Sequence, residues 1–157
     1  MAIPLVIAQM SLLSVLLLDS LYAIREFQTV GSSITLGNAG IAILSAVLIM
    51  AGICIAVWAK ISMPAGTFSI SPLPRKTSTL TLRGPYRHVR HPMYTGAIAT
   101  ATGMALLQPG ISPWLILIAL VAVLLAKIEL EEIELAGKFP QYQPSFSLIS
   151  KLIPGVY

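Results

Sequence analysis

Residues 40–59 read GIAILSAVLIMAGICIAVWA, a run without a single charged side chain. A transmembrane helix needs about 20 predominantly apolar residues, so this stretch predicts a membrane span. Residues 1–18 and 95–126 also lack Lys, Arg, Asp and Glu. The first of these stretches predicts a span over about 3–22. It has no basic region of the kind that begins a signal peptide, so we expect it to be retained.

The whole chain shares this apolar character. Of its 157 residues, 56% are hydrophobic and 10% are charged, whereas a soluble domain carries about 25% charged residues. Too few polar side chains remain to cover a water-exposed globule, which excludes a soluble enzyme and a disordered chain. The single cysteine, Cys54, excludes an internal disulfide. The composition indicates one integral membrane domain over residues 1–157.

The third charge-free stretch is interrupted by turn-forming residues at 108–113. We therefore expect two helices here, over 94–107 and from 113 to about 134, joined as a helical hairpin. The first arm is short for a full crossing and carries Gly96 and Gly103, small residues that let helices approach closely in lipid. The predicted fold is all-α, a polytopic membrane helix bundle of about four spans.

Basic residues predict the orientation of this bundle. Most of them lie in the loop between the second and third spans and in the C-terminal tail: Lys60, Arg75, Lys76, Arg83, Arg87, Arg90, Lys138 and Lys151. Because cytoplasmic loops are enriched in Lys and Arg, we expect both termini in the cytoplasm, beneath the inner membrane if the protein is bacterial. The net charge of +4 then indicates attraction to anionic membrane lipid and not to nucleic acid.

The first of two polar clusters precedes the third helix. Residues 84–96 read GPYRHVRHPMYTG and contain two arginines, two tyrosines and both histidines. Pro85 and Pro92 disfavour helix in the residues before them, so the backbone polar groups of this segment need other partners. A bound polar ligand could supply them. The simpler alternative is a basic, aromatic anchor at headgroup depth.

The second cluster lies at the expected cytoplasmic end of the last helix. Residues 127–134 read KIELEEIE and contain four carboxylates. Negative charge at a helix C-terminus opposes the helix dipole, at a cost of up to about 1 kcal/mol for each group. Lys127 and Glu131 form an i,i+4 pair, and the arginines of the first cluster are the larger source of compensation. The two clusters are therefore expected to meet in a polar pocket, although a solvated helix end is the simpler alternative.

Such a pocket would offer guanidinium groups for a carboxylate, carboxylates for an ammonium and aromatic walls for a ring. These features fit a zwitterionic amino acid joined to a nucleoside. Two histidines outside any span do not fit a bis-histidine haem site, and zinc would require more ligands. The sequence contains no Gly-rich phosphate loop, no nucleophilic cysteine with a base and no Rossmann fingerprint. We expect no metal.

The run 84–96 resembles the signature of the superfamily of isoprenylcysteine carboxyl methyltransferases and phospholipid methyltransferases. Residues 131–139, EEIELAGKF, followed by Tyr142 and Pro154, resemble the tail of that superfamily. The resemblance covers about two-thirds of the chain. It implies two N-terminal spans over 1–59, followed by a catalytic half, 60–157, with the basic loop, the hairpin and the tail. This half would build a cytosolic pocket for S-adenosylmethionine.

The resemblance also assigns residues to the cofactor: Thr79, Leu80, Thr81, Tyr86, Arg90, His91, Pro92, Met93, Tyr94 and Glu131. Lys127 falls where the isoprenylcysteine enzymes are expected to have an arginine for the substrate carboxylate. Its ammonium cannot form the bidentate pair that arginine makes. Pro140 stands where a glycine is usual, and Ser145 replaces the second tyrosine of the tail.

We therefore predict methyl transfer from S-adenosylmethionine to a lipid-like or hydrophobic acceptor at the cytoplasmic face. Arg90 and Glu131 are assigned to the amino-acid end of the cofactor, and Lys127 to an acceptor carboxylate such as that of isoprenylcysteine. A phospholipid amine would instead need a base, for which Glu132 or Glu134 is nearest. O-, N- and S-methylation all remain open. The expected catalytic set is Lys127, Glu132 and Arg90.

Two functions without methyl transfer also remain open. A small polytopic transporter would suit four spans, but it predicts an ionisable residue deep inside a span, and here the charges lie near the span ends. A membrane-structural protein would use the basic loop on anionic lipid, and charge-preserving changes such as Arg90→Lys would then be silent. A sterol-reductase-like enzyme of the same superfold is expected to have more spans.

Overall fold

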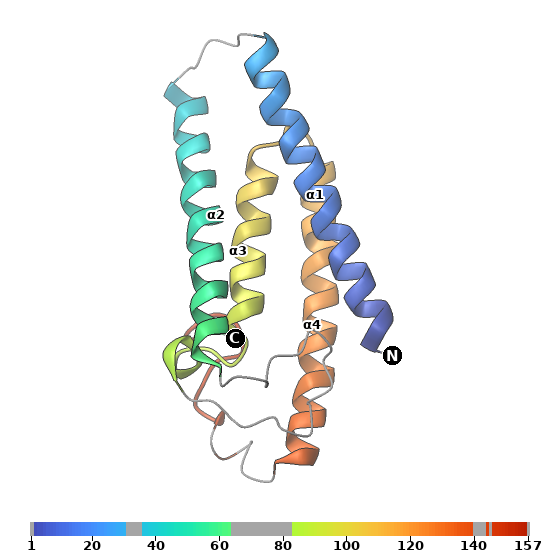
Figure 1. Ribbon diagram of the computed structural model, residues 1–157, viewed down its shortest axis with the longest axis vertical. Coiled ribbons are helices and arrows are strands. Elements are labelled where there is room, and N and C mark those ends of the chain that lie inside the picture. Colours follow the sequence, from blue (N-terminus) through green and yellow to red (C-terminus); the bar gives the residue numbers. More distant parts are fainter. Residues whose placement is uncertain (1, 31–35, 64–82, 140–143, 145, 157) are drawn as a thin grey trace.

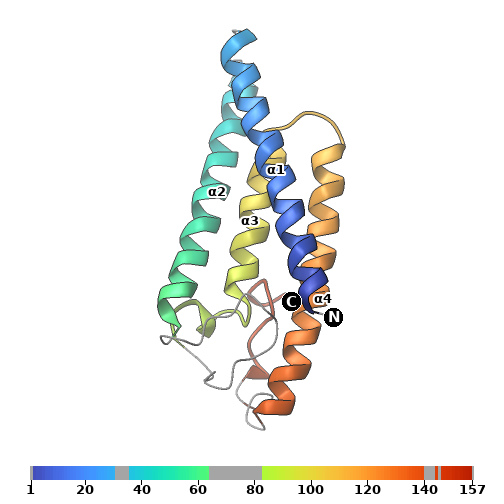
Figure 2. The same cartoon turned by 45° about the vertical axis from the view of Figure 1, so that its right-hand side comes forward.

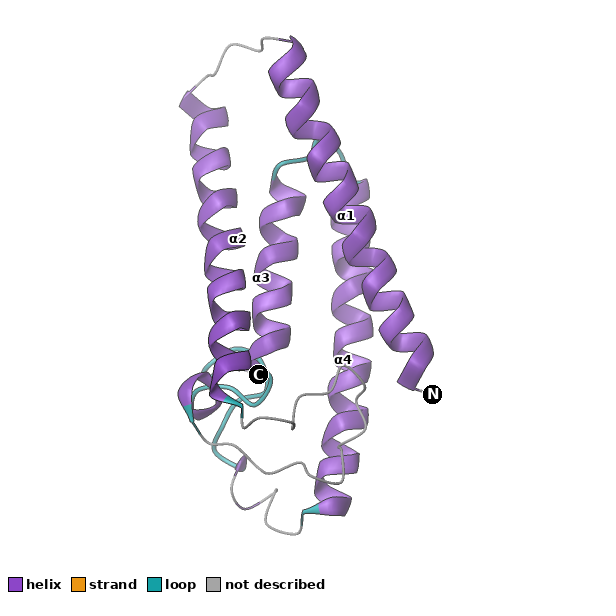
Figure 3. Ribbon diagram, viewed as in Figure 1, coloured by secondary structure: helices purple, strands orange, loops and turns teal. Residues whose placement is uncertain are grey.

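The computed structural model describes residues 2–30, 36–63, 83–139, 144 and 146–156. Within these residues the fold contains no strand and is built from α-helices with one short 3₁₀ helix (Figure 3). In chain order the elements are α1 (Ala2–Val30), α2 (Leu36–Ser62), the 3₁₀ helix η1 (Gly84–Arg87), α3 (Pro92–Leu106) and α4 (Ser112–Lys138). The predicted all-α class is confirmed.

Three of these helices are long and apolar enough to cross a membrane: Ile3–Arg25, Ala39–Ser62 and Ser112–Lys138. Large apolar side chains project from them into the surroundings, among them Ile7, Ile43 and Ile118. So much exposed apolar surface suits lipid and not water, and the chain is an integral membrane protein. α3 has 15 residues, fewer than a full crossing requires. The structure thus has three candidate spans and one shorter helix where about four spans were predicted.

Prolines determine where α3 and α4 begin. Pro92 and Pro113 each occupy the first turn of their helix, where the missing N–H of proline costs nothing. α4 ends at Lys138, one turn beyond the predicted 134, and Phe139 is extended. In the sequence Pro140 comes next, and a residue before proline avoids the helical conformation. Residues 107–111 separate α3 from α4 and overlap the predicted turn-forming residues 108–113, although Ser112 and Pro113 already belong to α4.

The helices do not pack in the order of the sequence. Figures 1 and 2 show α3 between α2 and α4, with α1 crossing over α4. α1 makes its main contacts with α4 and α3, and α3 packs more extensively against α2 than against α4. Where α1, α3 and α4 meet, the buried core consists of Leu16, Ala101, Ala105, Leu117, Leu120 and Leu124.

α2 and α3 approach so closely that only glycine fits at their contact. A Cβ on Gly52 would lie 2.5 Å from the carbonyl oxygen of Gly96, and a Cβ on Gly96 would lie 2.6 Å from the carbonyl oxygen of Gly52. A Cβ on Gly103 would lie 2.7 Å from the carbonyl oxygen of Ser45. Small residues allow such close packing of helices in lipid. The predicted role of Gly96 and Gly103 is confirmed, and the helix they meet is α2.

Polar contacts hold α1 at two levels of the bundle. The amide nitrogen Nε2 of Gln108 donates to the Ser20 hydroxyl at 2.9 Å, and this hydroxyl donates to the carbonyl oxygen of Leu16 at 2.7 Å. Nearer the N-terminus, Gln9 accepts a hydrogen bond from Lys127 of α4. Because apolar side chains gain little by leaving lipid for one another, such contacts and tight packing determine how the helices associate.

We predict that Gly52→Ala destabilises the bundle by about 1–3 kcal/mol, the usual cost of overpacking. The added methyl would overlap the backbone of α3 at Gly96. Thermal unfolding in detergent measures this cost. Gly40→Ala is the matched control on the same helix, because no atom lies within 4 Å of its added Cβ. Equal melting temperatures for the two variants would contradict the close contact of α2 with α3.

Candidate functional site

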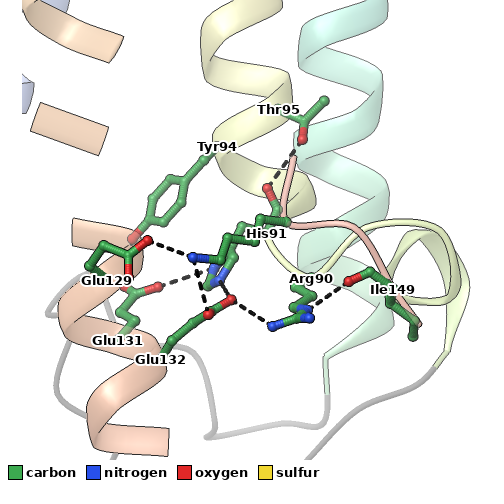
Figure 4. Close-up of polar contacts among 9 residues, drawn as sticks. Arg90, His91, Tyr94, Thr95, Glu129, Glu131, Glu132 and Ile149 are labelled. Atoms are coloured by element: carbon green, nitrogen blue, oxygen red, sulfur yellow. Dashed lines mark hydrogen bonds and ion pairs between the residues drawn. The ribbon is translucent and has the colours of Figure 1, made fainter. Parts of the chain in front are cut away.

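The two polar clusters meet at the lower end of the bundle in Figure 1. Figure 4 shows Glu131 and Glu132 of α4 directed toward Arg90 and His91, which lie just before α3. Nη1 of Arg90 donates to Oε1 of Glu132 at 3.1 Å. The hydroxyl of Tyr94 donates to Oε1 of Glu131 at 2.5 Å. These contacts confirm the prediction that the arginine-containing segment and the acidic helix end face each other.

The backbone before α3 is shaped by its contact with α2. Gly84 has φ +57°, a left-handed conformation that glycine adopts without strain. A Cβ at this position would lie 3.2 Å from Nε1 of Trp58 and would overlap the side chain of Ser62. η1 therefore lies directly against the end of α2. Tyr86 and Val89 are buried beneath the turn.

The C-terminal tail supplies acceptors for the backbone of this segment. The N–H of Arg90 donates to the carbonyl oxygen of Ser150 at 2.9 Å, and that of His91 donates to Lys151 at 3.0 Å. The hydroxyl of Thr95 donates to the carbonyl oxygen of Leu152 at 2.8 Å. The sequence indicated that these backbone groups need partners, and a bound ligand was the partner that we considered. Part of that need is met by the tail of the chain itself.

Arg90 connects the tail to α4. Its Nε donates to the carbonyl oxygen of Ile149 at 2.7 Å while Nη1 reaches Glu132 (Figure 4). The tail adds a second cation, because Nζ of Lys151 lies 2.5 Å from Oε1 of Glu129 and 3.4 Å from Oε2 of Glu132. Lys151 was not among the predicted site residues. The only signal for it was the excess of carboxylates on α4 over nearby cations.

His91 lies at the centre of the site, between two carboxylates. Its Nδ1 is 3.4 Å from Oε2 of Glu131, and its Nε2 is 3.5 Å from Oε1 of Glu132. The ring stacks on Tyr94, with centroids 5.7 Å apart. Burial alone lowers the pKa of His91, but the two carboxylates outweigh burial and raise it. The positive imidazolium is therefore the form that this site favours.

The remaining predicted cofactor residues differ in accessibility. Tyr86 is buried, and its burial and the charge of Glu131 raise the pKa of its phenol, which stays neutral. Pro92 is fully buried, while Met93 is half-buried. Residues 79–81, predicted to contact the cofactor, lie outside the described residues, as do residues 140, 142 and 145 of the predicted tail motif.

Lys127 differs most from its predicted environment. Its side chain is 2% exposed, and Nζ donates to Oε1 of Gln9 at 2.6 Å. The ammonium also lies over the ring of Tyr94, 5.1 Å from the centroid. Among the described residues no salt bridge joins Lys127 to Glu131, so the predicted pair is not formed as a direct contact, although the charge of Glu131 still acts on the ammonium. Gln9 was missed, since one amide in an apolar helix carries no motif.

An apolar cavity of about 430 Å³ lies beside this polar cluster. Its walls come from α3, α4 and the tail: Thr95, Ile98, Val121, Leu125, Leu152 and Ile153. This volume is within the range of small-molecule pockets. Thr95 borders the cavity, and its hydroxyl lies 3.3 Å from the carbonyl oxygen of His91, so the cavity is adjacent to the polar cluster. Among the described residues there is no group of three or more His, Cys, Asp or Glu that could hold a metal.

The raised pKa of His91 predicts that its contribution to stability depends on pH. In the unfolded chain the imidazole titrates near its ordinary pKa of 6.5. The folded protein holds the proton more tightly, so the stabilisation is complete below about pH 6.5 and is lost as the pH rises through the pKa of the folded state. Thermal unfolding of the protein and of His91→Gln between pH 5.5 and 9 measures it. A difference between the two that grows with pH would contradict the charged imidazolium.

A comparison with known proteins identifies the family of this chain. A family model described as phospholipid methyltransferase matches residues 41–141. Comparisons with curated proteins and with solved structures found no match. The matched residues cover more than half of the chain and include both 84–96 and 127–134, whereas α1 lies outside them. The chain therefore belongs to the phospholipid methyltransferase family, and this membership implies a membrane methyltransferase.

Proposed function

We propose that the protein transfers a methyl group from S-adenosylmethionine to a lipid or another hydrophobic acceptor at the cytoplasmic face of the membrane. The observation that carries this proposal is the meeting of Arg90, His91 and Tyr94 with Glu131 and Glu132. In the same proposal residues 60–157 form the catalytic half and both termini are cytoplasmic. Family membership supports methyl transfer but leaves the donor and the acceptor open.

The residues of the site fit this cofactor in charge and in hydrogen-bonding type. Glu131 offers a carboxylate to the ammonium, while the ring of Tyr94 already carries the cation of Lys127 and the stacked His91. Nε2 of His91 is buried and lies 3.5 Å from Oε1 of Glu132, but it makes no hydrogen bond to any described residue, so a ligand can still offer it an acceptor. Arg90 uses two of its five N–H donors in the contacts above and retains others for a carboxylate.

S-adenosylmethionine supplies a methyl group on a sulfonium, which is already activated toward a nucleophile. The protein then has to orient the acceptor and exclude water. Tyr86 and Tyr94 act as neutral walls, and the phenol of Tyr94 holds Glu131 in place. Glu132 has cations near both of its oxygens, Arg90 at one and Lys151 at the other. It is therefore a poor base, and we assign it to holding the site together.

The apolar cavity between α3 and α4 is our candidate position for the hydrocarbon part of the acceptor. Its walls are almost entirely apolar, and Thr95 borders the polar cluster. A lipid-like acceptor would then place its hydrocarbon tail in this cavity and its reactive group near His91. Lys127 is less suited to a direct role at the acceptor carboxylate, because its ammonium lies behind Tyr94 against Gln9.

Equilibrium binding of radiolabelled S-adenosylmethionine to the purified protein tests the donor. We predict binding by the wild type and a loss of about 10-fold or more for Glu131→Gln and His91→Ala, since hydrogen bonds to charged groups contribute about 1.5–3 kcal/mol. Asp19→Asn is the matched control, an exposed carboxylate outside the site. No binding by the wild type, or equal binding by all variants, would reject this donor.

Methyl transfer to a total lipid extract tests the acceptor. With a labelled methyl donor we expect the label in a hydrophobic product, whose mass identifies the acceptor. Arg90→Lys should slow the reaction about 10-fold or more, because lysine cannot span Glu132 and the carbonyl oxygen of Ile149 as a planar fork does. A membrane-structural protein would give no labelled product, and Arg90→Lys would leave its lipid binding unchanged.

A further inference from the structure

We propose that Gln9 of α1 is a positioning residue of the site: its amide oxygen holds the ammonium of Lys127 away from Glu131 and so keeps that carboxylate available for a ligand. The inference rests on the proposed function only in the identity of this ligand. Gln9 lies in α1, outside residues 41–141 that the family model matches. The first helix would thus complete a site whose other members come from the matched region.

The contact between Gln9 and Lys127 is buried. Gln9 is 7% exposed and Lys127 is 2% exposed. Oε1 of Gln9 accepts from Nζ of Lys127 at 2.6 Å, within the short range of charge-assisted bonds. Burying a charge without a partner is costly. Among the described residues, no carboxylate forms a salt bridge with this ammonium, so the Gln9 amide and the ring of Tyr94 are its compensation.

Glu131 is the competing partner for this ammonium. It lies one turn further along α4, at i,i+4, where side chains of a helix are neighbours. Its negative charge acts on Lys127 in the folded protein. Tyr94 contacts both groups: its ring lies beneath the ammonium of Lys127, and its hydroxyl donates to Glu131. Lys127 therefore needs only a change of side-chain conformation to approach Glu131.

The neutral amide of Gln9 competes with Glu131 for the ammonium of Lys127, and it binds this ammonium without adding charge. It holds the ammonium on the α1 side of Tyr94, and the two oxygens of Glu131 remain with Tyr94 and His91. Without it, we expect Lys127 to turn to Glu131 and form the local ion pair. Glu131 would then act less on His91 and would offer less negative charge to a bound cation.

Titration of His91 tests the inference without any ligand. The chain has two histidines, and His88 is exposed, so it serves as an internal reference in NMR spectra of the histidine-labelled protein in detergent. The groups that face His91 are Glu131 and Glu132 of α4 and the ring of Tyr94. In Gln9→Met, which keeps the length of the side chain, we expect the measured pKa of His91 to fall.

Four further variants make the result specific. Gln9→Leu should repeat the fall, while Gln9→Glu, which still holds the ammonium, should keep the pKa of His91 near that of the wild type. Adding Lys127→Met to Gln9→Met should restore it, because the competing cation is gone. Ser20→Ala removes the hydrogen bond between α1 and Gln108 at Ser20 and is the matched control, expected to leave His91 unchanged.

Binding of S-adenosylmethionine extends the test to the ligand. Gln9→Met should weaken it several-fold, and Gln9→Glu should not. If the wild type binds no cofactor but Gln9→Met lowers the pKa of His91, the proposed donor is wrong and the positioning role stands. An unchanged pKa of His91 in Gln9→Met and Gln9→Leu, an equal fall in Ser20→Ala, or no recovery in the double variant would overturn the inference.

Discussion

Compensation of the negative charge at the end of α4 organises this end of the molecule. Glu129, Glu131 and Glu132 lie in the last turns of a helix whose dipole already places negative charge there. The cations that pair with these carboxylates come from other parts of the chain. Arg90 and His91 lie in the segment before α3, and Lys151 lies in the C-terminal tail. The backbone N–H groups of Arg90 and His91 also donate to carbonyl oxygens of the tail, at Ser150 and Lys151. Balancing the charge therefore brings together α4, the segment before α3 and the tail.

The sequence was sufficient for whatever depends on local pattern. Charge-free runs gave the long helices, Pro113 gave the start of α4, and an acidic helix end without enough cations predicted the meeting with Arg90, whereas α3 begins at Pro92, two residues before the predicted 94. These inferences hold because each follows from the residue types within one segment. The small residues Gly96 and Gly103 predicted close packing for the same reason.

The sequence was insufficient where a tertiary contact competes with a local one. Lys127 and Glu131 have the spacing of a helical ion pair, but Lys127 donates to Gln9 instead and Glu131 accepts from Tyr94. Both of these partners are held in place by the packing of the bundle. The carbonyl oxygens of the tail, such as that of Ser150, carry no residue-specific signal, so their pairing with Arg90 could not be foreseen. The same applies to α3, which packs mainly on α2 although α4 follows it in the chain.

The pairing of charges also constrains what the site can bind. Arg90 and His91 are matched by Glu132 and Glu131 in the folded protein, so an ion of one sign would leave an uncompensated charge in a buried place. The amino-acid end of the proposed donor is zwitterionic and would avoid this cost, with its carboxylate at Arg90 and its ammonium at Glu131, while the sulfonium gives the whole molecule one further positive charge. In our proposal the paired charges bind the amino-acid end of the donor, and α1 supports this binding by keeping Lys127 with Gln9.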